Sequence, residues 1–322
     1  MSRKKDTDYL SISARIRAME PRLLTAERLE RMVDARDDAE ALKVLNECGY
    51  PEVTGTAGLQ LEQALNASRT AMLDELAAAA GDDALVDMFR LKYDYHNAKV
   101  LVKARARGQK AERLLVRGGR YAPDLQDCGE QLGQSVEQAM AVLVDTGDPQ
   151  QADILLDRAY LAELVQLAAA SGSPFLQGYA RLTVDAANLR ACVRCARLDK
   201  DREFMARVLA PGGEVSAEAL LRSWGQDIGP LFRSGPLAEA AKLADRLSKP
   251  GSGALTELER ACDDAQMDYQ RRAHRIPFGR EVVAGYLFAR EAERTAIRTV
   301  MAGRVAGLAP DEIRRRLRRT YV

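Results

Sequence analysis

The feature that most constrains this chain is a short motif that occurs three times. In each copy an acidic residue is followed three positions later by a short side chain, and then by an apolar residue and a cation. The copies lie 91 residues (185 − 94) and 108 residues (293 − 185) apart, a spacing too long for a solenoid, whose repeats span roughly 20–50 residues. The sequence therefore predicts a set of small related domains. The motif residues are Asp94, Asn97 and Lys99, then Asp185, Asn188 and Arg190, then Glu293, Ala296 and Arg298.

Placing the motif on a helix shows which of its residues share a face. At about 100° per residue, Asp94 and Asn97 share a face with Leu101, whereas Lys99 and Lys103 lie opposite. The second copy has the same arrangement. The acid and the amide are therefore expected to be at least partly buried, where a carboxylate needs hydrogen-bond donors. We hypothesise that these acids tie their helix to the rest of the unit or to the next unit.

Helix signals recur along the whole chain and predict an all-α fold with little or no sheet. Asp37 followed by Glu40, and Thr256 followed by Glu259, have the spacing of capping boxes. Pro310 is expected at the first position of a final helix whose last turns are rich in arginine. Breaks between helices are expected at Gly118-Gly119, Gly147–Pro149, Ser171–Pro174, Pro211–Gly213 and Lys249–Gly253.

Charge is balanced over the chain but not along it. With 48 basic and 47 acidic residues, the chain lacks the broad positive field that draws nucleic acid to a surface, and no nucleic-acid partner is expected. Two basic runs stand out, one between residues 99 and 120 and one at the C-terminus. They fit either solvated helix faces or contacts with acidic protein or lipid headgroups. The candidate partner-contact residues are Lys103, Arg107, Arg314, Arg315 and Arg318.

Motifs for catalysis, cofactors and metals are not found. The sequence has no phosphate-binding GxxxxGK[ST] loop, no HExxH and no DDxxD. Cys192 and Cys195 form a single CxxC inside a repeat helix, which favours a packing role over metal or redox use. The five cysteines and the lack of a long apolar stretch indicate a chain of the reducing cytoplasm. We predict no enzyme activity, no cofactor and no metal.

Several segments resemble the C/d (AC39) subunit family of rotary V/A-type ATPases. FRLKYDYHNAK (89–99) is similar to the family's signature, and YLSISARIRAMEPRLL (9–24) to its opening helix. TVDAANLRACVR (183–194) and GYLFAREAERTAIR (285–298) are similar to its later repeat segments. The third copy departs from the family pattern because Ala296 stands where Asn is usual.

The resemblance implies a fold and a mechanical role. It implies three similar helical domains in a pseudo-threefold, funnel-like arrangement. The units are expected at 1–122, 123–215 and 216–322, with signature helices near 85–107, 176–198 and 281–306, and the termini may pack together. It also implies a non-catalytic rotor subunit, a socket on the cytoplasmic face of the membrane. This socket would join the central-stalk D and F subunits to the membrane ring of K/c subunits, within a complex that contains A and B subunits and couples ATP to proton or sodium transport. The alternative is a helical scaffold or adaptor unrelated to rotary ATPases.

Overall fold

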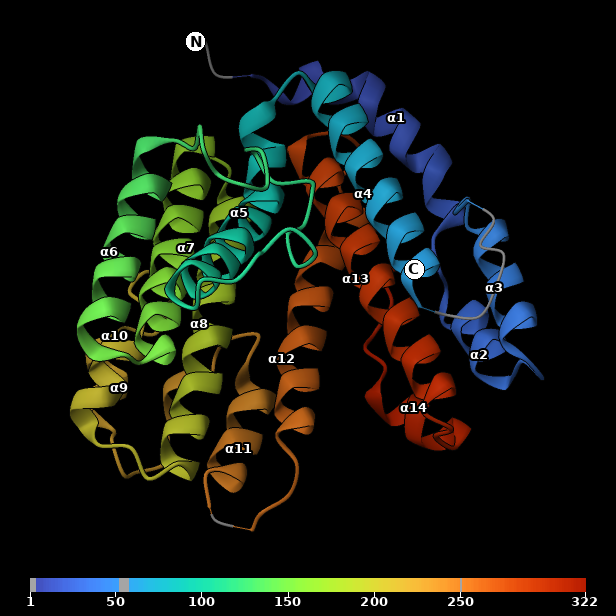
Figure 1. Ribbon diagram of the computed structural model, residues 1–322. Helices are drawn as coiled ribbons and strands as arrows, with labels where there is room; N and C mark the ends of the chain where they lie inside the picture. The colour runs from blue at the N-terminus through green and yellow to red at the C-terminus, as the bar shows by residue number, and fades with distance from the viewer. Residues whose placement is uncertain (1–3, 52–57, 250) are drawn as a thin grey trace. The chain divides into compact units, whose positions relative to one another are not determined.

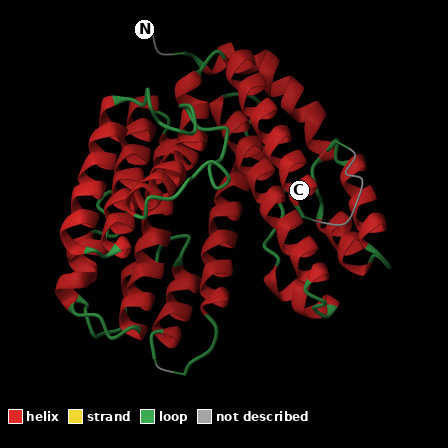
Figure 2. Ribbon diagram, viewed as in Figure 1, coloured by secondary structure: helices red, strands yellow, loops and turns green. Residues whose placement is uncertain are grey.

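The computed structural model describes residues 4–51, 58–249 and 251–322. Helices make up the regular structure of this described part, and it contains no strand (Figure 2). The prediction of an all-α fold is therefore confirmed. The local reason is visible in the sequence, since Ala, Leu and long charged side chains lose little rotamer freedom in a helix.

The chain divides into two compact units. Unit 1 comprises Met1–Val86 and Asp263–Val322, and unit 2 comprises Asp87–Cys262. The boundaries fall inside two helices, α5 (Asp83–Ala106) and α12 (Leu255–Gln270). Both ends of the chain belong to unit 1, so residues from the expected first and third units share one compact unit. The expected three-unit, funnel-like arrangement stays a prediction.

Unit 1 is built around its longest helix, α13. This helix packs against α1, α2, α4 and α14 (Figure 1). A buried apolar cluster joins the N-terminal helices α2 and α3 to the C-terminal helices, with Met32, Leu45 and Ile297 among its members. The bounds are α1 Leu10–Met19, α2 Ala26–Asp34, α3 Asp38–Glu47, α4 Leu59–Ala80, α13 Arg280–Val305 and α14 Pro310–Arg316.

Unit 2 begins with α5 and contains three long helices, α6, α7 and α8, packed in chain order. The two connections between them, Gly147–Pro149 and Gly172–Pro174, follow one rule. Each has a left-handed glycine at the helix end, an N-capping Asp or Ser, and Pro at the first helical position. The bounds are α6 Glu130–Thr146, α7 Pro149–Ser171, α8 Pro174–Arg197, α9 Arg202–Val208, α10 Ala217–Arg222 and α11 Ala238–Leu247.

The structure confirms two of the predicted local helix signals and contradicts one. Asp37 caps α3 by accepting the Glu40 N–H at 2.8 Å, and Pro310 opens α14. The Thr256 cap is wrong, because α12 already begins at Leu255. Glu259, its expected capping partner, instead forms an ion pair with a cation of α8. A capping spacing alone does not distinguish an N-cap from a residue inside the first turn.

Candidate functional site

The first motif acid fastens α5 to the loop that follows it. Asp94 is fully buried and accepts from Arg120 Nε at 2.7 Å and from the Tyr121 N–H at 3.4 Å. Arg120 also donates to Glu163 of α7 at 2.5 Å, and the Tyr95 hydroxyl donates to the same carboxylate at 2.8 Å. One guanidinium thus bridges two buried carboxylates, which keeps both charges paired in a place where an unpaired charge is costly.

Each motif asparagine binds a loop through a pair of hydrogen bonds to the backbone of one residue. Asn97 donates to the Val116 carbonyl and accepts the Val116 N–H, both at 2.8 Å. Asn188 makes the same pair with Ala210, at 2.8 and 2.9 Å. Because an amide side chain both donates and accepts, it can satisfy one residue's two backbone groups at once.

The second motif acid accepts from backbone N–H groups alone among the residues that the structure describes. Asp185 of α8 accepts the N–H groups of Glu214 and Val215, at 3.0 and 3.1 Å. The prediction that Asp94 and Asp185 are buried is confirmed. The donors to both acids are loop residues of the same compact unit.

A pair of adjacent glycines lets each loop approach the carboxylate of Asp94 or Asp185 closely. The first glycine is left-handed, with φ of +97° at Gly118 and +101° at Gly212, a region that glycine enters without steric cost. The second glycine lies against the carboxylate, because a Cβ at Gly119 or Gly213 would be 3.1 or 3.0 Å from the carboxyl carbon. The Gly-Gly breaks in the sequence are therefore part of the acid-binding loop.

We expect Gly119→Ala and Gly213→Ala to lower the free energy of unfolding by about 1–3 kcal/mol each, since the new methyl group displaces a buried carboxylate from its donors. Gly133→Ala is the control, because a Cβ at this helical glycine would meet only Cys128 Sγ, at an ordinary contact distance of 3.8 Å. Its replacement should stabilise α6 by up to about 1 kcal/mol. Urea unfolding of the full chain measures all three. Equal stability of Gly119→Ala and wild type would contradict the tight fit.

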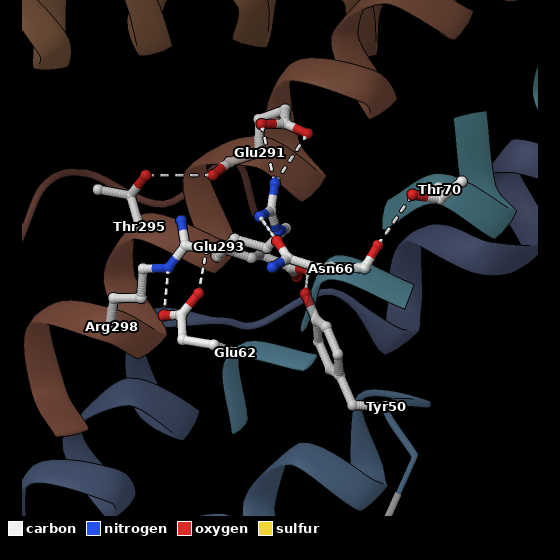
Figure 3. A network of polar contacts seen from close by, with 9 residues as sticks. Tyr50, Glu62, Asn66, Thr70, Glu291, Glu293, Thr295 and Arg298 are labelled. Carbon is white, nitrogen blue, oxygen red and sulfur yellow. Dashed lines mark hydrogen bonds and ion pairs between the residues drawn. The ribbon is translucent and has the colours of Figure 1, made fainter. Parts of the chain in front are cut away.

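The third motif acid is bound by a segment from the other end of the chain. Glu293 of α13 is buried and accepts from the Leu24 N–H and from Arg290 at 2.7 Å. It also accepts from the Tyr50 hydroxyl at 3.0 Å (Figure 3). Ala296, in the asparagine position, packs against the apolar cluster of unit 1. The N-terminal segment thus supplies hydrogen-bond donors to the acid of α13, as loops later in the chain do for the acids of α5 and α8.

The motif cations connect each repeat helix to a neighbouring helix. Lys99 forms an ion pair with Asp157 of α7, and Arg190 donates to the Glu259 carbonyl of α12 at 3.3 Å. Arg298 makes two bonds of 2.6 Å to Glu62 of α4, which Figure 3 shows from close by. The acid therefore holds a loop or segment, and the cation on the opposite face holds a helix.

The repeat extends further along the helices than the motif indicated. Fourteen residues after each acid (108 − 94, 199 − 185, 307 − 293) the backbone is left-handed, at Gly108, Asp199 and Gly307. At each place the next N–H bonds to the carbonyl five residues earlier, at 2.9–3.0 Å, which is the Schellman end of a helix. Sequence reasoning missed this shared end because Asp replaces Gly in the second copy. The equal offset of fourteen residues was the available signal.

Comparison with known proteins gives a family match over nearly the whole chain. Residues 12–316 match the model of one family, the ATP synthase (C/AC39) subunit. The chain belongs to this family. The C subunit of the V-type sodium ATPase of Enterococcus hirae is 22% identical over 98% of this chain and 99% of its own length. The C subunit of the A-type ATP synthase of Haloquadratum walsbyi is 24% identical over 94% and 96%, and that of the V-type ATP synthase of Deinococcus radiodurans is 25% identical over 96% and 90%.

Burial shifts the titration of the three motif acids in this member of the C/AC39 family. It raises the pKa of Asp185 from 3.8 to about 6, opposed by the Val215 and Glu214 N–H groups. Burial also raises the pKa of Asp94, where Arg120 opposes the shift, and the pKa of Glu293, where Arg290 does so. In each case the loss of water is the larger influence.

A pH dependence follows for Asp185. A carboxyl whose pKa is raised on folding stabilises the fold fully below about pH 4 and loses that contribution as the pH rises through about 6. Two pKa units correspond to about 2–3 kcal/mol, so this much pH dependence should disappear in Asp185→Asn between about pH 4 and 7. Denaturant unfolding at several pH values measures it. Asp145→Asn, on the surface of α6, serves as the control and should follow wild type, whereas a D185N profile parallel to wild type would contradict the assignment.

The candidate partner-contact residues have different surroundings. Lys103 pairs with Asp153 at 3.1 Å, and Arg318 pairs with Asp263 at 3.0 Å. Arg314 contacts three carboxylates, those of Glu30, Asp34 and Asp311. Arg107 and Arg315 are exposed. Their contacts with partners stay a prediction.

The two cysteines of the CxxC motif lie inside the fold. Cys192 and Cys195 are buried, and burial raises the pKa of both thiols, that of Cys192 to about 12.

Within the residues that the structure describes, no group of three His, Cys, Asp or Glu side chains is placed to hold a metal ion. Over the same residues, no helix combines the length and the apolar character that crossing a bilayer requires.

Proposed function

We propose that this chain is a non-catalytic central-rotor subunit of a V/A-type ATPase or ATP synthase. In this proposal it forms a socket between the central stalk and the membrane ring, and it transmits the rotation that couples ATP hydrolysis or synthesis to proton or sodium transport. The observation that carries the proposal is the C/AC39 family match over residues 12–316. Relatives that are named as the C subunits of such enzymes, and that align over nearly their full length, support it.

The polar contacts support a mechanical role. Each repeat helix is held on one face through a buried acid and on the other through a cation. Buried hydrogen bonds and ion pairs restrict how neighbouring elements can pack, and a part that transmits torque must deform little. These contacts stiffen the repeat helices against their neighbours without requiring any group that takes part in chemistry.

The proposal names partners and a location. The direct partners would be the D and F stalk subunits and the K/c ring, in a complex that also contains the catalytic A and B subunits. The chain would lie on the cytoplasmic face of the membrane and contact it only through this complex.

Affinity purification of the tagged chain from solubilised membranes tests the proposal. The A, B, D, F and ring subunits should copurify with it, and the isolated chain should not hydrolyse ATP. A parallel purification with an unrelated tagged protein controls for subunits that adhere to the resin. Recovery of the chain alone, or with unrelated proteins, would favour the scaffold alternative.

A further inference from the structure

The last residues of α5 and the exposed stretch that follows them carry four cations without an ion-pair partner among the described residues. This cationic loop, residues 105–114, contains one acid, Glu112. Its exposed cations are Arg105, Arg107, Lys110 and Arg113. The net charge of the loop is therefore +3 (4 − 1), whereas that of the whole chain is +1.

The neighbouring basic residues differ from those of the loop because they have partners inside the chain. Lys99 and Lys103 pair with α7, and Arg120 bridges two buried carboxylates. Most of the C-terminal arginines form ion pairs in unit 1, namely Arg314, Arg316, Arg318 and Arg319. For the four cations of the loop, the described part of the chain provides no ion pair and no side-chain hydrogen bond.

The loop is held in place at both ends. At its start, the Schellman end of α5 fixes the chain direction, with the Gln109 N–H bonded to the Ala104 carbonyl at 2.9 Å. At its end, His96 contacts the Leu114 carbonyl at 3.3 Å, and Asn97 binds Val116 just beyond. The Leu114 side chain is 64% exposed. An ordered loop loses little conformational entropy on binding, which favours recognition.

We propose that the cationic loop is a docking surface for an acidic protein surface in the rotary complex, with Leu114 entering an apolar recess beside it. The proposal rests on the proposed function. Three of the four cations are arginine, which is enriched in protein interfaces where lysine is depleted and which binds carboxylates through two parallel bonds. The loop contains no Trp or Tyr, the residues that mark contact with the membrane interface.

Charge reversal of the loop tests this inference. The variant Arg105→Glu, Arg107→Glu, Lys110→Glu, Arg113→Glu should bind the ATPase complex isolated without this chain at least tenfold more weakly than wild type at about 50 mM salt. The difference should shrink at about 500 mM salt, because exposed charges are then screened. A Leu114→Ser variant should bind more weakly at both salt concentrations. All substituted side chains are exposed, so the helix content should not change.

A matched control reverses four exposed cations elsewhere, Arg22→Glu, Lys43→Glu, Arg233→Glu and Arg275→Glu, and should bind within about threefold of wild type. Equal weakening of the control, or wild-type binding by the loop variant, would overturn the docking surface alone. Failure of wild type itself to bind the complex would instead reject the proposed function. Binding of wild type, but not of the loop variant, to vesicles of phosphatidylcholine with phosphatidylglycerol, with complex binding unchanged, would assign the loop to lipid and overturn the inference.

Discussion

Replacing Arg120 with alanine should lower the free energy of unfolding by about 3–5 kcal/mol, because it leaves buried carboxylates without their cation. The Arg120 side chain is 11% exposed, and those of Asp94 and Glu163 are 0% and 8% exposed. Arg120 also opposes the upward shift of the Asp94 pKa. In the variant that pKa should rise further, so the loss of stability should become smaller as the pH falls through it. Urea unfolding at two pH values measures both effects.

Two comparisons make the Arg120 result specific. Asp94→Ala should cost less, about 1–3 kcal/mol, because Arg120 keeps its bond to Glu163. Arg107→Ala removes an exposed arginine of the cationic loop and should change stability by less than about 0.5 kcal/mol. If Arg120→Ala were no more harmful than Arg107→Ala, the bridge between α5 and α7 would have no importance for the fold.

Replacing Glu293 with alanine should destabilise unit 1 by a similar amount, about 3–5 kcal/mol. The substitution removes the acceptor for the Leu24 N–H and the Tyr50 hydroxyl, and it leaves the Arg290 guanidinium buried without a carboxylate. Hydrogen exchange followed by mass spectrometry should show faster exchange in α13 and α2. Exchange in α8 should be affected less, because Asp185 and its donors lie in unit 2.

A double variant separates lost charge pairing from lost packing. Arg290→Met with Glu293→Leu removes both charges and leaves apolar side chains in the same place, so it should be more stable than Glu293→Ala. Tyr50→Phe removes one hydrogen bond and should cost about 1 kcal/mol. If the double variant were as unstable as Glu293→Ala, an unpaired Arg290 would not be the cause.

Much of the repeat could be read from residue spacing. Hydrophobic periodicity placed Asp94 and Asn97 on a buried face, and the Gly-Gly breaks marked the loops that these side chains bind. The partners of Asp94 were harder to find. Arg120 follows 26 residues later, and Glu163 lies 43 residues beyond that. The basic run in which Arg120 stands predicted a solvated or partner-binding face, and nothing local distinguished Arg120, whose side chain is only 11% exposed, from the other cations of the run.

The sequence by itself determined the helical class, the three motif copies and the family, because these depend on side-chain periodicity and on residues close together in the chain. Only the tertiary structure decided which segment completes the third copy. Leu24 and Tyr50 reach Glu293 across 269 and 243 residues, and no local pattern encodes a contact at that separation. The physical reason is that a buried carboxylate must find donors somewhere, whereas which donors it finds depends on how distant helices pack.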